Sequence, residues 1–278
     1  MSNYDQLKSN GAKFWDSNPC GGNWSTYREF MQWIRKTEPY FFDILDTYTW
    51  QGLKIAEIGC GQGTTLNYLP SKGARMIGLD ISWESVKQAY KGAEELGHID
   101  RICVVQADAE KIPFLDSVFD RVISCGVLHH TVDTAGGIRN VYRILKPGGT
   151  AIIMLYHSGN PKWWMTNLIR WISKCIDRLA GREGVIAEKI RSKQRADSAS
   201  GTALLELFGV PILKAFSNQQ VRKMFSGFSK VKITNHQPGF RRMADILPGL
   251  KFLTGFLSWL DRVTIRFWGF YQVIEAEK

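Results

Sequence analysis

The spacing of hydrophobic positions changes twice along the chain. Residues 1–50 are polar and rich in aromatic side chains, which indicates helices that precede a core. Between residues 53 and 155, short apolar runs alternate with segments of helical period, such as the one from Trp83 to Leu96. This alternation predicts βαβ units and a parallel sheet with its ligands at the carboxyl ends of the strands. The predicted strands are 54–58, 75–79, 101–106, 119–125 and 150–155, with a turn at 146–149 before the last one.

Beyond Leu155 the alternation stops. Residues 161–180 have a helical period that places Trp164, Leu168 and Trp171 on one face. A helix near 219–225 and two strand-like segments, 230–234 and 268–276, follow. We therefore expect an α/β fold: a Rossmann-like doubly wound sheet, mostly parallel with an antiparallel last strand. A helical cap over 1–50 precedes the main domain, 51–278, which carries lid-like helical insertions after strands five and six, at about 157–216 and 237–266.

Charge separates the same two regions. The 278 residues hold 36 Lys+Arg and 26 Asp+Glu, a net charge of +10. Residues 1–155 hold 16 basic and 17 acidic residues, so the whole excess lies in residues 156–278. The five cysteines form no CxxC pair, so neither a zinc site nor a disulfide framework is indicated, and no metal is expected. Because the N-terminus lacks the apolar run of a signal peptide, we expect a cytoplasmic protein.

The strongest chemical signal is a glycine-rich loop between a strand and a helix. Gly59, Gly61 and Gly63 allow a close backbone approach to a ligand, and the following helix directs its N-terminal amides there. Glu57 beside the loop favours a ligand with an ammonium or sulfonium group. Asp80 ends the second strand, where a carboxylate can accept both hydroxyls of a ribose. Asp108 follows the third strand and is placed to accept a hydrogen bond from the amine of adenine.

Together these motifs resemble class I S-adenosylmethionine-dependent methyltransferases of the small-molecule type, the group that includes the ubiquinone/menaquinone C-methyltransferases. The resemblance covers residues 50–155 through EIGCGQG, GLDIS, ADAEKIPFLDSVFDRVISCGVLHHT and RILKPGGTAIIMLY. It implies S-adenosylmethionine as cofactor and S-adenosylhomocysteine as product. It implies that Glu57, Gly59, Gly61 and Gly63 bind the amino acid moiety, Asp80 and Ile81 the ribose, and Asp108 and Ala109 the adenine. Ser124, Cys125 and Gly126 would lie near the sulfonium, and Cys60 of the glycine-rich loop is also expected to bind the cofactor.

Methyl transfer requires positioning and, for a protonated acceptor, a base. His129 and His130 follow the fourth strand and His157 follows the fifth, so we expect one of them to orient or deprotonate the acceptor. Tyr156, Trp163 and Trp164 are the candidate substrate contacts. The acceptor is expected to be small and apolar, either lipid-like or aromatic, and the methylated atom, O, C or N, stays open.

The basic, Trp-rich insertions leave three interpretations. They form an acceptor lid that touches the inner face of the membrane, or they pack on the domain or in a homodimer with their basic side chains solvated. Alternatively, the basic region binds RNA as the methyl acceptor. The sequence has Ser124-Cys-Gly-Val127 where amino-methylating nucleic acid enzymes of this fold carry a Pro-Pro-aromatic turn, which disfavours nucleic acid. A non-catalytic cofactor-binding partner subunit is a further alternative.

Overall fold

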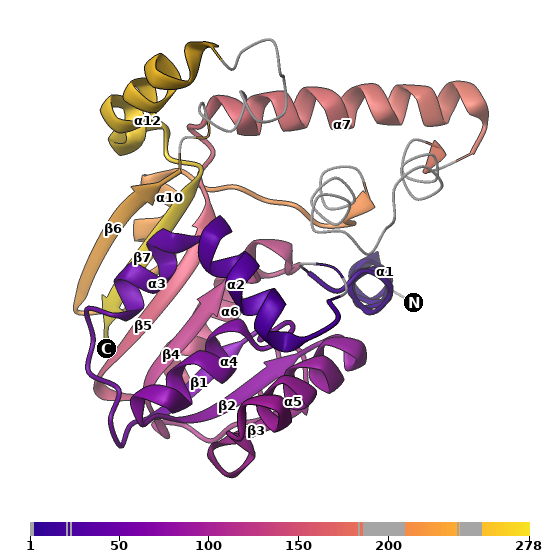
Figure 1. Cartoon of the computed structure of the whole chain (residues 1–278). Coiled ribbons are helices and arrows are strands. Elements are labelled where there is room, and N and C mark those ends of the chain that lie inside the picture. Colours follow the sequence, from indigo (N-terminus) through magenta and orange to yellow (C-terminus); the bar gives the residue numbers. More distant parts are fainter. Residues whose placement is uncertain are drawn as a thin grey trace.

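A single sheet of seven strands forms the centre of the molecule. The computed structural model describes residues 3–20, 22, 24–182, 184–185, 209–237, 239 and 252–278. The strand order is β3-β2-β1-β4-β5-β7-β6, and β7 runs antiparallel to both of its neighbours (Figure 1). The predicted fold class is confirmed. The strands are β1 (Lys54–Ile58), β2 (Arg75–Asp80), β3 (Ile102–Gln106), β4 (Phe119–Cys125), β5 (Leu145–Tyr156), β6 (Lys230–His236) and β7 (Tyr271–Glu277).

Helices cover both faces of this sheet because successive strand residues point to opposite sides. Ile152 and Met154 of β5 belong to the core cluster that contains helices α3, α4 and α5. Ile153 and Leu155 belong to the cluster that contains α6 and the residues around α10. The helices are α1 (Asn3–Ser17), α2 (Tyr27–Thr37), α3 (Pro39–Leu45), α4 (Thr64–Tyr68), α5 (Trp83–Leu96), α6 (Thr134–Ile144), α7 (Pro161–Ala180), α10 (Asn218–Met224) and α12 (Thr254–Trp268), with short 3₁₀ turns at Leu69–Lys72, Ile99–Arg101 and Leu128–His130.

Capping residues fix where the crossover helices begin. The Ser82 hydroxyl accepts a hydrogen bond from the backbone amide of Ser85 at 3.1 Å and caps α5. The Asp133 carboxylate accepts one from Gly136 at 2.8 Å and caps α6. These bonds satisfy amides that have no partner inside the helix. As a result, both helices start directly after the loops at the carboxyl ends of β2 and β4.

Two predicted boundaries are wrong. Residues 146–149, predicted as a turn, belong to β5, because Phe119 pairs with Leu145 while Arg121 pairs with Thr150. The additional residues on β5 form a bulge, which Gly148 accommodates at a φ of 74°. Trp268, predicted to start the last strand, instead ends helix α12, and β7 begins at Tyr271.

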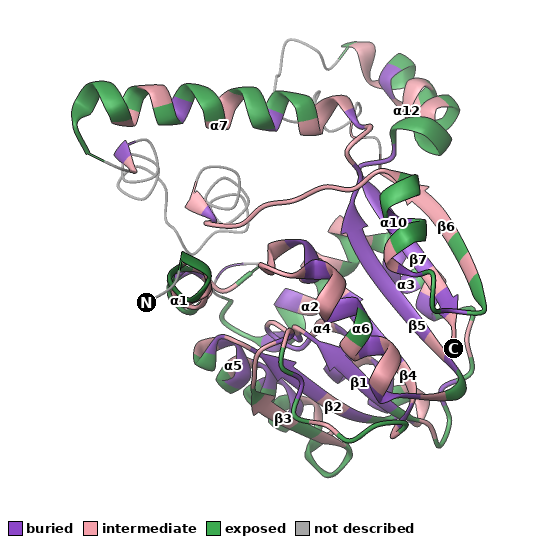
Figure 2. Ribbon diagram, turned by 180° about the vertical axis from the view of Figure 1, so that it is seen from behind, coloured by how far each residue is buried: buried purple, intermediate pink, exposed green. Residues whose placement is uncertain are grey.

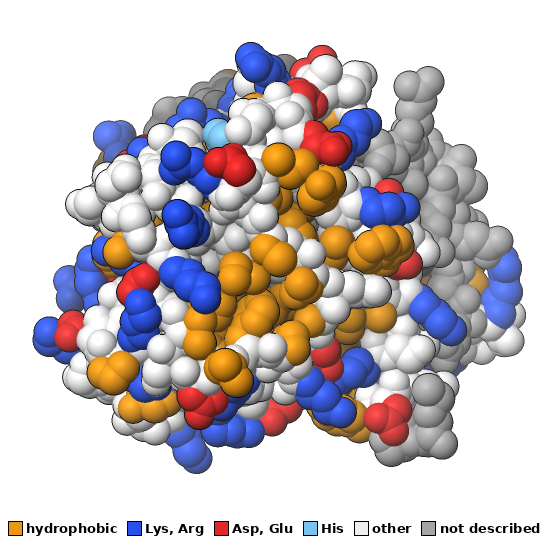
Figure 3. Space-filling model, turned by 90° about the horizontal axis from the view of Figure 1, so that it is seen from below, with side chains coloured by type: hydrophobic (Ala, Val, Ile, Leu, Met, Phe, Trp, Pro, Cys, Tyr) orange, Lys and Arg blue, Asp and Glu red, His pale blue; other side chains and the backbone are white. Residues whose placement is uncertain are grey.

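The two predicted insertions contribute α7 and α12, at the same end of the molecule (Figures 1 and 2). Residues 186–208 and 240–251 of these insertions lie outside the described residues. Within the described part of the chain, the structure has no helix that meets both the length and the hydropathy needed to cross a membrane. On another face of the molecule, hydrophobic side chains gather near the centre, with Lys and Arg side chains around them (Figure 3).

The antiparallel strand β7 contributes buried residues to the core and should therefore contribute to stability. Ile274 is fully buried in the core cluster that contains α6, so Ile274→Ala should reduce the free energy of unfolding by about 2–5 kcal/mol in urea denaturation. Leu115 is 79% exposed, and Leu115→Ala should change it by less than about 0.5 kcal/mol. Equal effects of the two substitutions would contradict the placement of β7.

Candidate functional site

A cavity of about 390 Å³ lies at the carboxyl ends of the strands. Its wall combines residues from the loops after β1 to β4 with residues from α1, α2, α3, β5 and the start of α7. The structure brings most of the predicted site residues together in this wall. These are Glu57, Gly59, Cys60, Gly61, Asp80, Ile81, Asp108, Ala109, Cys125, Gly126, His130, Tyr156 and Trp163.

The loop that follows β1 packs closely against the loop that follows β4. Gly59 has a φ of 72°, and a Cβ atom there would lie 2.3 Å from Cγ2 of Val127. The Gly59 amide donates a hydrogen bond to the carbonyl of Leu79 at 2.7 Å, which ties this loop to β2. Only glycine combines this conformation with this close approach. The loop therefore has a fixed position beside the cavity.

Glu57 is the most perturbed acidic group of the site. Its side chain is 3% exposed, and Oε2 has no hydrogen-bond partner among the described residues. Burial raises the pKa of Glu57 to about 8, although hydrogen bonds from Thr65 and from the backbone amide of Leu66 act in the opposite direction. A positively charged donor placed against Oε2 would both pair the oxygen and favour the ionised carboxylate. The site therefore fits the ammonium group of an amino acid moiety.

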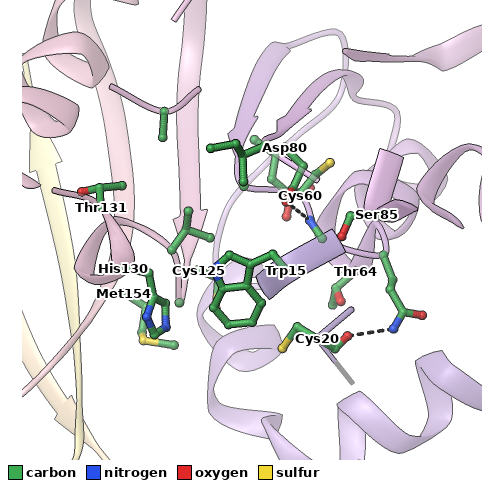
Figure 4. A pocket seen from close by; sticks show the side chains of 18 of the residues that line it. Trp15, Cys20, Cys60, Thr64, Asp80, Ser85, Cys125, His130, Thr131 and Met154 are labelled. Carbon is green, nitrogen blue, oxygen red and sulfur yellow. Dashed lines mark hydrogen bonds between the residues drawn. The ribbon is translucent and has the colours of Figure 1, made fainter. Parts of the chain in front are cut away.

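Asp80 is buried at the end of β2 and is oriented by backbone amides. Its Oδ2 accepts a hydrogen bond from the Gly61 amide at 2.8 Å (Figure 4), and its Oδ1 accepts one from the Ser82 amide at 2.9 Å. Burial raises its pKa, while these amide hydrogen bonds lower it. Each carboxylate oxygen has two lone-pair sites, so both oxygens retain capacity for a further donor. This geometry suits a pair of vicinal hydroxyls.

Asp108 has a partner that the sequence did not indicate. Lys8 of α1 places Nζ 2.6 Å from Oδ2 of Asp108 and 3.1 Å from Oε2 of Glu110. Burial lowers the pKa of Lys8, but the hydrogen bonds to Asp108, Tyr4 and Glu110 outweigh it and hold the pKa above its ordinary value. An adenine amine at Asp108 would therefore share this carboxylate with a lysine, or displace it.

Helices α1 and α2 complete the site, although the sequence placed residues 1–50 only as a cap. Trp15 lines the cavity together with Cys60, Cys125 and His130 (Figure 4). Its ring centroid is 5.0 Å from that of His130, in an edge-to-face arrangement. The Gln62 amide donates to the carbonyls of Cys20 and Gly22 at 2.8 and 2.7 Å, so the glycine-rich loop also holds the segment after α1. The aromatic density of residues 1–50 was the only signal of this role.

An aromatic wall forms the β5 and β7 side of the cavity. Tyr156 lies with its ring centroid 4.6 Å from that of Phe270 and 5.6 Å from that of Tyr271. Glu38, which sequence reasoning did not select, also lines the cavity. Burial raises the pKa of Cys125 well above its usual range, and the Glu38 charge adds to this effect. Further aromatic residues of the wall are Phe30, Trp33, Phe41, Phe42 and Trp163.

Two residues predicted to contact the cofactor do not line the cavity. The Ser124 hydroxyl is fully buried and donates to the carbonyl of Ile58 at 2.9 Å, which joins β4 to β1. Gly63 starts α4 with a φ of 87°, and a Cβ atom there would lie 2.7 Å from Nδ2 of Asn67. Both residues act on the structure around the site.

The three candidate histidines differ in whether they line the cavity. His129 is fully buried and stacks on Tyr156 with centroids 3.9 Å apart, and neither ring nitrogen has a hydrogen-bond partner among the described residues. Burial holds its pKa well below the usual range, so it is neutral. His157 is buried, with its Nδ1 3.1 Å from the carbonyl of Gly269. Neither ring lines the cavity, and Trp164 is 59% exposed outside it.

His130 is the histidine in the cavity wall. Its Nδ1 lies 2.8 Å from the carbonyl oxygen of Ile212. Because a carbonyl oxygen only accepts, Nδ1 carries the hydrogen, and in the neutral ring Nε2 carries a lone pair. This tautomer can accept a proton. Among the described residues, no group of three or more His, Cys, Asp or Glu side chains could hold a metal ion.

Comparison with known proteins agrees with this geometry. Residues 56–153 match a family model described as a methyltransferase domain. A sterol 24-C-methyltransferase of Gibberella zeae is 34% identical over 42% of this chain and 29% of its own length. A ubiquinone/menaquinone biosynthesis C-methyltransferase of Pectobacterium carotovorum is 29% identical over 53% of this chain and 63% of its own length. The matches thus span less than two thirds of these curated relatives.

The fold has solved counterparts. An S-adenosylmethionine-dependent methyltransferase from Mesorhizobium loti superposes with a TM-score of 0.54 at 20% identity, over 86% of this chain and 96% of that chain. This similarity covers much more of the chain than residues 56–153 and concerns the fold.

Glu57 is predicted to dominate cofactor affinity. Glu57→Gln removes the charge facing the expected ammonium group, and a charge-assisted hydrogen bond contributes about 1.5–3 kcal/mol. Calorimetric titration with S-adenosylmethionine should therefore give a dissociation constant about 10–100-fold higher. Glu94→Gln makes the same change on the exposed face of α5 and should leave it unchanged. Unchanged binding by the Glu57 variant would contradict the assignment.

Glu57 also predicts a pH dependence of stability. The folded chain holds its proton to about pH 8, whereas an unfolded carboxyl releases it near its ordinary value of 4.5. Its contribution is therefore present below about pH 4.5 and is lost as the pH rises through 8. The free energy of unfolding of the wild type, minus that of Glu57→Gln, should fall between pH 5 and 8 in urea denaturation. Parallel profiles for the two proteins would exclude this.

Proposed function

Because residues 56–153 match a family model described as a methyltransferase domain, we propose that the protein transfers a methyl group from S-adenosylmethionine to a small apolar acceptor. One observation carries the proposal: a single cavity joins a polar side to an aromatic side. Glu57, Asp80 and Asp108 lie at the ends of β1, β2 and β3, while Tyr156 and Tyr271 lie on β5 and β7. In the sheet order these two groups are separated by β4.

The polar side supports cofactor binding. Glu57 would hold the amino acid moiety through its unpartnered Oε2, Asp80 the ribose hydroxyls, and Asp108 with Ala109 the adenine. Cys125 and Gly126, at the end of β4, would lie between the two sides. When bound, the cofactor supplies a methyl group already activated by its sulfonium. The protein's contribution is then to position the acceptor and exclude water.

The aromatic side supports an apolar acceptor that fits between rings. Aromatic side chains bind flat, apolar ligands through stacking and edge contacts. One relative named above is a sterol methyltransferase and another is a methyltransferase of ubiquinone and menaquinone biosynthesis. Sterols and quinones are apolar molecules of this kind. A lipid-like or aromatic acceptor is therefore favoured over a polar metabolite.

His130 is proposed as the base or orienting group. It lines the cavity, and its Nδ1 hydrogen bond to Ile212 leaves Nε2 as the proton-accepting nitrogen. For an acceptor with a hydroxyl or an acidic carbon, this nitrogen would hold the proton released on methylation. Of the three predicted histidines, it is the one whose position supports this role.

The cavity lining weighs against RNA as the acceptor. Basic side chains among the lining residues are Lys8 and Lys162, and Lys8 is paired with Asp108 and Glu110. RNA binding relies on many basic contacts along an open groove. A non-catalytic cofactor-binding subunit would instead bind S-adenosylmethionine without transferring its methyl group.

The activity test uses the purified protein with methyl-labelled S-adenosylmethionine. Label should appear in an organic-solvent extract of lipids and apolar metabolites, and not in total RNA. His130→Gln should lower the turnover rate by about 10²- to 10⁴-fold when a proton is removed, with cofactor affinity unchanged. His98→Gln, a histidine outside the cavity lining, is the matched control and should retain full activity.

Each other result has a defined meaning. Label in RNA would overturn the small-acceptor proposal, and cofactor binding without label in any fraction would indicate a non-catalytic subunit. A His130→Gln variant within a few-fold of wild type would remove His130 as the base and leave methyl transfer intact.

A further inference from the structure

Helix α7 presents its apolar face to solvent. Its buried residues are Thr166 and Ser173, both small and polar. Trp164, Leu168 and Trp171 lie on the opposite face and are 59%, 55% and 63% exposed. An amphipathic helix that packed on the domain by its apolar side would show the reverse pattern. The packing of α7 on the protein therefore does not account for its apolar residues.

Helix α12 repeats this arrangement. Phe256, Trp259, Val263 and Phe267 are spaced three or four residues apart, so they form one stripe, and all are about half exposed or more. Phe256 and Trp259 stack with ring centroids 5.7 Å apart. Exposed basic residues accompany the apolar faces of both helices: Lys174 and Arg178 on α7, and Arg262 and Arg266 on α12.

The two helices lie at the same end of the molecule (Figures 1 and 2). Helix α7 follows β5 and α12 precedes β7, and the adjoining strand ends pair at Tyr156 and Tyr271. Most of the exposed large hydrophobic side chains in the described part of the chain belong to these helices and to Phe252 just before α12. Apolar exposure on this scale marks an interaction surface.

We propose that the exposed faces of α7 and α12 bind the interfacial region of an anionic lipid bilayer. Trp and Phe side chains partition into the boundary between headgroups and acyl chains, while flanking Lys and Arg side chains contact the phosphates. Each basic residue near an anionic surface strengthens binding about fivefold. Both helices carry more basic than acidic residues, so their charge complements such a surface.

Charge also distinguishes the bilayer from a second copy of the chain. A symmetric contact would use the same patch on both copies. It would bring Arg262 and Arg266 of one copy near the corresponding basic residues of the other, which like-charge repulsion opposes. RNA would match the charge, but it would leave the aliphatic residues Leu168 and Val263 uncovered.

The cavity adjoins this surface. Lys162, Trp163 and Thr166 from the first turns of α7 line the cavity, as does Phe270, two residues after α12. A bilayer bound at these helices would therefore lie beside the aromatic side of the cavity. Binding itself does not depend on the proposed methyl transfer and is measured without it.

The experiment is flotation of the full chain with vesicles, without cofactor. The protein should float with phosphatidylcholine vesicles that contain 40% phosphatidylglycerol, remain in solution with pure phosphatidylcholine, and bind less in high salt. Trp259→Ser/Phe267→Ser should weaken binding to the anionic vesicles at least about tenfold. Arg262→Glu/Arg266→Glu should weaken it at least about 25-fold.

Matched controls carry the same changes elsewhere. Trp83→Ser/Tyr90→Ser alters two exposed aromatic residues of α5. Arg75→Glu/Arg101→Glu reverses two exposed charges, at the first residue of β2 and just before β3. Both should float like wild type, and all four variants should keep the wild-type thermal unfolding temperature because their side chains are exposed.

Three outcomes would overturn the proposal. They are wild-type protein that stays in solution with anionic vesicles, binding that the α12 variants leave unchanged, and a dimer that Trp259→Ser/Phe267→Ser converts to a monomer. The last result, measured by size-exclusion chromatography with light scattering, would assign these faces to contact between copies of the chain. None of them bears on whether the enzyme transfers methyl groups.

Discussion

The burial of the Glu57 carboxylate is the constraint on which the site depends. Moving a charged group out of water costs several kcal/mol unless a proton or a positive partner compensates. The fold places this group 3% exposed at the end of β1, with Oε2 unpartnered in the described structure and a pKa of about 8. The glycine-rich loop packed against Val127, and Asp80 bonded to Gly61, fix the surroundings. A cationic ligand would supply the positive charge that the described residues do not place at Oε2.

Lys8 of α1 distinguishes the acidic residues that line the cavity from one another. Lys8 provides a positive charge to Asp108 and Glu110, whereas no lysine or arginine is bonded to Glu57 among the described residues. Asp108 and Glu110 thus have a basic partner, whereas Glu57 has none among the described residues. Trp15 and the aromatic residues of α2 and α3 cover the same opening, so the segment before the sheet is part of the site itself.

The basic excess of the chain lies in a different part of the sequence from the acidic residues of the site. Residues 1–155 are nearly neutral, and several of their ionic groups are paired within the domain, such as Arg143 with Asp116 and Lys146 with Asp120. The excess lies in the part of the sequence that contains α7 and α12. On α7 and α12, exposed basic residues such as Lys174 and Arg262 accompany exposed aromatic residues, and Lys162 at the start of α7 lines the cavity.

The sequence by itself determined the sheet and the polar half of the site. The bounds of α5 and α7 agree with their predicted ranges, and Glu57, Asp80 and Asp108 lie where strand-end positions predicted, because these patterns depend on neighbouring residues. Only the tertiary structure decided that Lys8 and Trp15 enter the cavity, that His130 faces it while His129 and His157 are enclosed, and that α7 packs by its polar face. The contacts of Lys8 and Trp15 join residues about 100 or more positions apart, which no local pattern reveals. The period of α7 predicts an amphipathic helix, but it does not say whether the apolar or the polar face packs on the protein.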